Sequence, residues 1–251
     1  MSKPIARRGY RIVAMLTACL LAACTSLSRP PSTPADGDTP PPIPVTTYHA
    51  LAAGGEPVYR IDADRSRLWV VLYRAGALGE AGHNHVIAAN DMTGYFGWRR
   101  GDWRSARADL SVPVTELVAD PPGARRGWES FFGEQPPPSA RAATQENLRG
   151  ASVLDAQRYP RVRVSLAALT GAPPRPVARF TVWLGGRRRS LSVPVALTRA
   201  KDALVVEGRI AVRHEELGLT PFAAFGGALR VADPMVIDFR LHAEPWSPDG
   251  R

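Results

Sequence analysis

The sequence lacks the short motifs that mark common enzyme and cofactor sites. It contains no His-Glu-x-x-His, no Cys-x-x-Cys, no Gly-x-Ser-x-Gly and no glycine-rich phosphate loop. Aspartates and glutamates are scattered along the chain instead of clustered in one segment. We therefore expect no enzymatic activity and no cofactor.

The chain also lacks a basic segment of the kind that binds nucleic acids. Its formal net charge is +9, but four basic residues lie among the first 11, and their removal would leave +5. No cluster of Lys and Arg is interleaved with aromatic residues. Arg187–Arg189 follows Gly185 and Gly186, as in a solvated hairpin turn. We expect no nucleic-acid partner.

Residues 1–23 have the features of a secretory signal peptide. The four basic residues precede an apolar run, Ile12–Ala23, whose 12 residues are too few to span a bilayer comfortably. The run ends in Leu21-Ala22-Ala23-Cys24, which resembles a bacterial lipobox. This resemblance implies that Cys24 is the site of lipid attachment and that its acyl chains anchor the protein to a membrane. An ordinary signal peptide followed by an incidental cysteine is the alternative.

The residues after Cys24 predict a location and a linker. Thr25 follows the cysteine, which by resemblance to lipoprotein sorting rules favours the outer membrane, so we expect a lipid-anchored protein at the periplasmic face of the cell envelope. Cys19, the other cysteine, would leave with the signal peptide, and the mature protein would then hold no disulfide. Residues 24–56 are rich in proline and predict a disordered linker, followed by a domain over 57–246 and a tail over 247–251.

Alternation of apolar and polar residues dominates the domain. Six segments show it: 106–114, 161–169, 178–184, 190–197, 203–213 and 234–243. A period of two over so many segments predicts antiparallel strands with one apolar and one polar face. The segment 67–75 is apolar on both faces, which predicts cover on both sides.

Evidence for helices is thin. The segment from Ser139, a suitable N-cap, to Gly150, a suitable stop, predicts one short helix inserted between strands. The fold class is therefore all-β, and such a sheet either closes into a barrel or splits into a sandwich. A barrel of about eight strands encloses just enough space for side chains or one small ligand. The inward faces would be apolar, and the pattern leaves open whether they bind a ligand or only fill the interior.

Three segments resemble the YceI-like family in order and spacing: YRIDADRSRLWVVLYRAG at the start of the domain, ENLRGASVLDAQRYPRVRVS at 146–165 and GRIAVRHEELGL at 208–219. The resemblance covers about residues 58–244. It implies an antiparallel lipocalin-like β-barrel, and because some members of that family hold a polyisoprenoid chain, it implies a ligand that is an isoprenoid or another lipid. No catalytic residues follow from it. The segment GHNHV departs from the pattern of familiar members.

That departure contains His83 and His85, whose side chains would point to the same face of a strand. Three interpretations stay open. The two histidines bind a metal, with His214, Glu215, Glu216 or His242 as further ligands. Alternatively, they form the polar end of an apolar tunnel. In the third interpretation they tie down a strand end, while Asn84 bonds to nearby backbone.

These observations predict a periplasmic lipoprotein that binds or carries an apolar isoprenoid-like lipid inside a β-barrel. The residues expected to line the interior or its mouth are Trp69, Val71, Tyr73, Phe180 and Trp183, with His83 and His85 at the polar end. One alternative is a non-catalytic structural or interaction module of the envelope with a filled barrel. The other is a histidine-based metal-binding protein.

Overall fold

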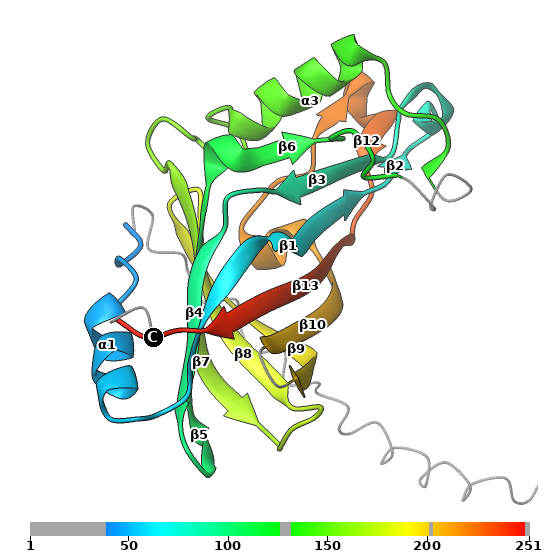
Figure 1. The fold of residues 1–251 in the computed structure, drawn as a ribbon. Coiled ribbons are helices and arrows are strands. Elements are labelled where there is room, and N and C mark those ends of the chain that lie inside the picture. Colours follow the sequence, from blue (N-terminus) through cyan, green and yellow to red (C-terminus); the bar gives the residue numbers. More distant parts are fainter. Residues whose placement is uncertain (1–38, 126–131, 201–202, 249–251) are drawn as a thin grey trace, which may run out of the picture. The chain divides into compact units, whose positions relative to one another are not determined.

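Eight antiparallel strands close into a ring in the computed structural model, which describes residues 39–125, 132–200 and 203–248 (Figure 1). In order around the ring these are β1 (Val58–Leu72), β4 (Thr93–Arg99), β5 (Asp102–Pro113), β7 (Arg161–Thr170), β8 (Val177–Leu184), β9 (Arg187–Ala200), β10 (Ala203–Val212) and β13 (Met235–Pro245). The ring closes because β13 pairs with both β10 and β1. The expected all-β antiparallel barrel is confirmed. The predicted signal peptide and Cys24 lie outside the described residues.

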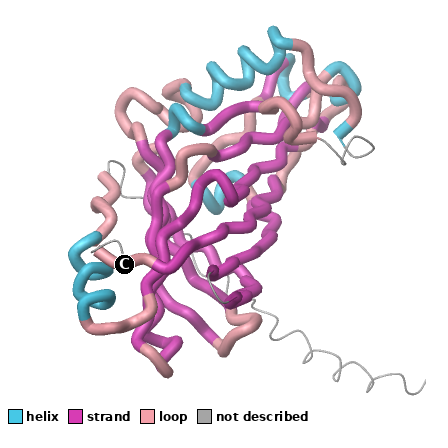
Figure 2. Tube along the Cα trace, in the orientation of Figure 1, coloured by secondary structure: helices cyan, strands magenta, loops and turns pink. Residues whose placement is uncertain are grey.

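Smaller elements surround the ring. The first part of β1 pairs with β4 and its last part with β3 (His85–Ala89), which in turn pairs with β6 (Leu117–Ala119). A separate three-stranded sheet contains β2 (Arg74–Ala75), β11 (Ala223–Ala224) and β12 (Leu229–Val231). The described ranges contain two α-helices, α1 (Val45–Ala53) and α3 (Pro138–Arg149), and four short 3-10 turns at 79–81, 114–116, 214–217 and 225–227 (Figure 2). The helix expected from Ser139 to Gly150 is α3, between β6 and β7.

The alternating segments form the strands that they predict, namely β5, β7, β8, β9, β10 and β13. Their apolar side chains pack into one cluster inside the ring, where Leu110 and Val112 of β5 meet Val162 and Val164 of β7. Burying this apolar surface is the main force that holds the barrel together. The ring therefore follows directly from the alternating sequence.

The prediction that the whole of residues 24–56 is disordered is wrong for α1. Its Tyr48 is fully buried and donates a hydrogen bond to Asp109 Oδ2 at 2.6 Å. The ring of Tyr48 also stacks on Tyr95 of β4, with centroids 5.1 Å apart. One aromatic side chain that packs on the barrel thus holds the helix in place, although proline dominates the sequence before it.

No helix in the described parts of the chain combines the length and the apolar character that a bilayer span requires.

Candidate functional site: an apolar cavity in the barrel

The interior of the barrel contains a cavity of about 200 Å³. Its lining comes from all eight strands of the ring and from β3 and β6, and it is apolar except for Asp109. The lining includes Leu68, Val70, Phe96, Leu110, Val162, Val164, Phe180, Val182, Leu191, Val193, Val206, Ile210, Ile237, Phe239 and Leu241. Leu217, from the 3-10 turn at 214–217, also lines it. The carboxylate of Asp109 bonds to Tyr48 and Arg163, so it is already paired. The cavity therefore offers a ligand dispersion and hydrophobic contacts, with no free charge.

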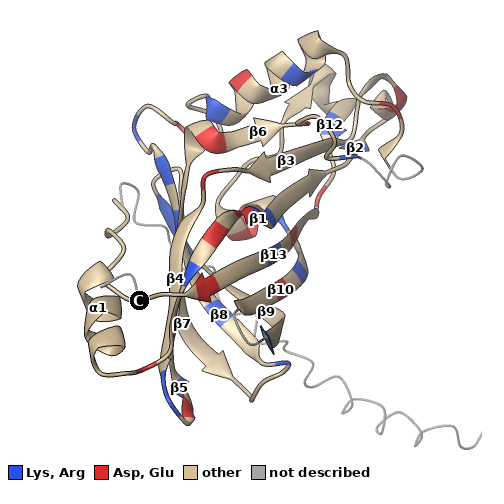
Figure 3. Ribbon diagram, viewed as in Figure 1, with Lys and Arg blue, Asp and Glu red and all other residues tan. Residues whose placement is uncertain are grey.

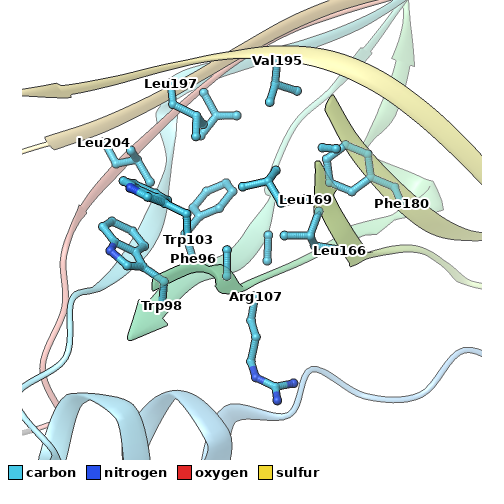
Figure 4. Close-up of a pocket in the computed structure, with 14 residues that line it drawn as sticks. Phe96, Trp98, Trp103, Arg107, Leu166, Leu169, Phe180, Val195, Leu197 and Leu204 are labelled. Carbon is cyan, nitrogen blue, oxygen red and sulfur yellow. The ribbon is translucent and has the colours of Figure 1, made fainter. Parts of the chain in front are cut away.

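A second space of about 50 Å³ lies beside the cavity (Figure 4). Phe96, Ala108, Phe180 and Val206 line both spaces. Trp98 and Trp103 line only the second one, and their rings stack with centroids 4.5 Å apart. Arg107 extends away from these aromatic rings in Figure 4. The apolar interior thus continues past Phe96 and Phe180 toward a pair of tryptophans.

Of the five side chains expected at the lining, Phe180 borders the cavity. Trp69, Val71 and Tyr73 do not, because Leu68 and Val70 occupy the inner face of β1. A β-bulge between Asp62 and Arg67 shifts the register of β1 against β13. Before the bulge the odd-numbered residues Tyr59 and Ile61 face the interior, and after it the even-numbered residues do. Trp183 borders neither space. The prediction that Trp69, Val71, Tyr73 and Trp183 face the interior is therefore wrong.

Trp69, Val71 and Tyr73 belong to a second apolar cluster on the outer face of β1. They border a pocket of about 120 Å³ together with Phe132, Val236, Arg209 and Asp238. Phe132, Val86 and Ala124 cover this face, which explains why the segment 67–75 is apolar on both sides. At one end of the pocket Asp238 accepts hydrogen bonds from Arg67 and Arg209, each at 2.7 Å.

His85 is held by a buried carboxylate. Its Nδ1 lies 2.6 Å from Oδ2 of the fully buried Asp120, and its Nε2 lies 3.3 Å from the hydroxyl of Thr144 in α3. Asp120 also accepts hydrogen bonds from the backbone N–H of Val86 at 3.0 Å and from Arg125 at 2.8 Å. Burial alone would raise the pKa of Asp120, but these bonds from His85, Arg125 and Val86 outweigh it and lower the pKa. The network joins β3 to the segment after β6 and to α3.

His83 is exposed, and its ring centroid lies 6.2 Å from that of His85. Neither histidine borders the cavity or the smaller space beside it. Within ranges 39–125, 132–200 and 203–248, neither histidine belongs to a group of three candidate metal ligands. Asn84 accepts a hydrogen bond from the backbone N–H of Arg74 at 2.9 Å. The geometry around His85 and Asn84 thus fits the interpretation in which the segment ties down a strand end.

The remaining metal candidates lie apart from this pair. His214 bonds to Asp233 through its backbone N–H at 2.9 Å, and its ring Nδ1 lies 3.2 Å from the same oxygen. Glu215 accepts a hydrogen bond from the guanidinium of Arg213, and Glu216 accepts one from the backbone N–H of Arg213. His242 lies on β13, opposite Asp62 of β1. The structure therefore brings none of them together with His83 and His85.

Sequence reasoning missed Phe96, Trp98 and Trp103, which shape one end of the interior. The segment TGYFGWRRGDW does carry a signal, because it places two aromatic residues two apart before a glycine turn. Gly101 in that turn has φ of +83°, a conformation that suits glycine.

Comparisons with known proteins support the fold. No protein-family profile matches the chain, and neither does any curated protein. Among solved structures, Burkholderia cenocepacia BcnA is similar with a TM-score of 0.52 and 14% sequence identity, over 72% of this chain and 98% of BcnA. A Campylobacter jejuni YceI protein has a TM-score of 0.45 and 8% identity, over 63% of this chain and 84% of that one. The described domain therefore shares its barrel fold with BcnA.

Proposed function

We propose that this protein binds an apolar molecule inside its barrel. The observation that carries the proposal is the cavity of about 200 Å³, whose lining is apolar apart from a carboxylate that is already paired. An empty apolar cavity costs stability because the side chains around it lose dispersion contacts. A guest restores those contacts, and an apolar guest gains the free energy of leaving water as well.

The size of the cavity limits the guest. An apolar cavity of about 150 Å³ holds a molecule the size of benzene, whereas drug-sized sites start at about 300 Å³. The cavity therefore accommodates one small hydrocarbon or a short part of a longer chain. An isoprenoid tail would extend past Phe96 and Phe180, which line both spaces, toward Trp98 and Trp103. The proposed ligand is an isoprenoid-like or other lipid chain that enters in this way.

The test starts from protein purified without organic solvent. The protein is extracted with solvent, and the extract is analysed by mass spectrometry. We expect a prenyl or acyl chain in a fixed ratio to protein. In parallel, a fluorescent hydrocarbon probe is titrated into solvent-stripped protein, and we expect saturable binding of one probe per chain. Failure of both measurements would contradict the proposal and favour a filled structural module.

We further propose that the protein is exported and anchored to the periplasmic side of the outer membrane through acylated Cys24. The basic start, the short apolar run and the lipobox-like Leu21-Ala22-Ala23-Cys24 support this. Cells that express the protein are labelled with a clickable fatty acid, and the labelled protein is followed by membrane fractionation. We expect label on the wild type and none on Cys24→Ala. Equal labelling of the two would contradict the anchor.

A further inference from the structure

The seam at which the barrel closes carries a group of three metal-ligating side chains. Asp62 of β1 lies directly opposite His242 of β13, and Glu244 follows two residues later on the same face of β13. Each residue offers one ligand atom, and the three atoms lie within 4.8 Å of one another. Figure 3 shows acidic positions on β1 and at the end of β13.

His242 has an unpartnered ring nitrogen. The residue is 9% exposed, and its Nδ1 is buried without a hydrogen-bond partner. A buried polar atom without a partner costs free energy, and few of them occur in folded proteins. The Ser66 hydroxyl holds the backbones of β1 and β13 together at this point. It accepts a hydrogen bond from the His242 N–H at 2.9 Å and lies 2.6 Å from the Asp62 carbonyl oxygen. The imidazole is thus held beside two carboxylates.

We propose that Asp62, His242 and Glu244 bind one divalent transition-metal ion of the zinc type. One imidazole and two carboxylates form a mixed nitrogen and oxygen donor set, which suits zinc better than magnesium or calcium. Ligands of a tetrahedral zinc ion lie about 3.4 Å apart, so atoms that lie within 4.8 Å of one another must approach by at most about 1.4 Å. Glu244, whose side chain is 54% exposed, is free to make that movement.

Arg65 lies beside both carboxylates of the proposed site. Its guanidinium lies 3.2 Å from Glu244 and 3.9 Å from Asp62, and its side chain is 58% exposed. The arginine therefore balances the two negative charges and can swing into solvent when an ion arrives. Because the two cations compete, removal of the arginine charge should strengthen metal binding.

The ion would link the two strands that close the ring. Pairing between β1 and β13 is interrupted by the bulge between Asp62 and Arg67, so the seam is irregular at the proposed site. An ion that binds only the folded barrel stabilises it by mass action. This role does not depend on the ligand in the barrel interior.

The experiment uses the purified protein after treatment with a chelator. Zinc chloride is titrated by calorimetry, and the melting temperature is recorded with and without zinc. We expect one zinc ion per chain and a higher melting temperature. Glu244→Gln and His242→Gln should each weaken binding at least tenfold, and Arg65→Gln should tighten it about fivefold, as expected for a lost exposed ion pair.

Two matched variants complete the design. Glu207→Gln removes an exposed carboxylate that pairs with Arg240, and His83→Gln removes the exposed histidine of the GHNHV segment. Both should bind zinc like the wild type. No stoichiometric binding, or binding that is unchanged in Glu244→Gln, would overturn the proposal. Glu244 is exposed, so its substitution tests the site even if His242→Gln fails to fold.

Discussion

At the scale of single residues, the buried ion pair between Arg163 and Asp109 holds neighbouring segments against the barrel. Arg163 is 3% exposed and donates to Asp109 Oδ1 at 2.6 Å and to the carbonyl of Leu110 at 3.0 Å. It also donates to the carbonyl of Pro41 at 3.2 Å. Since Asp109 accepts from Tyr48 as well, one buried charge pair holds both α1 and the segment before it. Such a pair is costly to break because either partner would be left buried alone.

Tyr48→Phe should destabilise the protein by about 1–2 kcal/mol, because one oxygen of the buried Asp109 loses its donor. Burial and the bond to Asp109 also raise the pKa of Tyr48, so its hydroxyl stays protonated and donates across the neutral range. Urea unfolding measures the loss. Tyr95→Phe is the control, since its ring stacks on Tyr48 while its hydroxyl makes no hydrogen bond in the described structure. Equal losses in the two variants would contradict the role of the hydroxyl.

The Asp120 carboxyl predicts a pH dependence. Its pKa is lowered in the folded protein, so it contributes stability that is full above about pH 4, its unfolded value, and that is lost as pH falls through the folded pKa. Asp120→Asn should therefore show a smaller loss of unfolding free energy between pH 6 and pH 3 than the wild type. Urea titrations at several pH values measure this. The same pH slope in both proteins would exclude Asp120 as a source of acid sensitivity.

At the scale of elements, α3 protects an open sheet edge. β6 pairs with β3 on one side, and on the other side Gln145 of α3 bonds to its backbone. The amide of Gln145 donates to the carbonyl of Leu117 at 2.8 Å and accepts from the N–H of Ala119 at 2.9 Å. A side chain thus replaces the next strand, and the edge cannot pair with another chain.

Gln145→Ala should leave those two backbone groups without partners. We expect a loss of about 1–2 kcal/mol in unfolding free energy and faster amide hydrogen exchange at Ala119. Glu146→Ala, at the neighbouring exposed position, should change neither quantity. If the exchange rate at Ala119 is the same in both variants, Gln145 does not protect the edge.

The elements differ in how well the sequence predicts them. The alternating segments and the helix at Ser139 were predictable, because each carries its own periodicity or stop signal. The inner face of β1 was not, because a bulge reverses the alternation and the strand is apolar on both sides. For α1, the local signal is weak: Pro44 precedes it and Gly54 follows, but its position depends on the distant Asp109. The cavity could be predicted only as an apolar interior, since its free volume depends on packing.

At the scale of the whole molecule, the proposed function depends on free volume inside the barrel. A substitution that fills this volume tests whether the ligand binds there. Val164 of β7 borders the cavity, whereas Val177 of β8 is 41% exposed on the surface. A larger side chain at the first position consumes cavity volume, and at the second it extends into solvent.

Val164→Phe should therefore reduce probe affinity at least tenfold while the barrel stays folded, and Val177→Phe should leave affinity unchanged. Fluorescence titration measures binding, and circular dichroism checks the fold. Overpacking costs typically about 1–3 kcal/mol, so the unfolding free energy is recorded for both variants. Unchanged probe affinity in Val164→Phe would place the binding site outside the cavity.

The closure of the ring by β1 and β13 also sets the order of events in folding. A chain made from its amino end presents β1 early, but β13 supplies Ile237, Phe239 and Leu241 to the cavity only when nearly all residues have emerged. Contacts between such distant segments form slowly, because a long loop must first be closed. Until then the apolar face of every other strand is open to water and to neighbouring chains. A guest molecule that arrives during this interval would meet a sheet without an interior, so capture has to wait for the last strand.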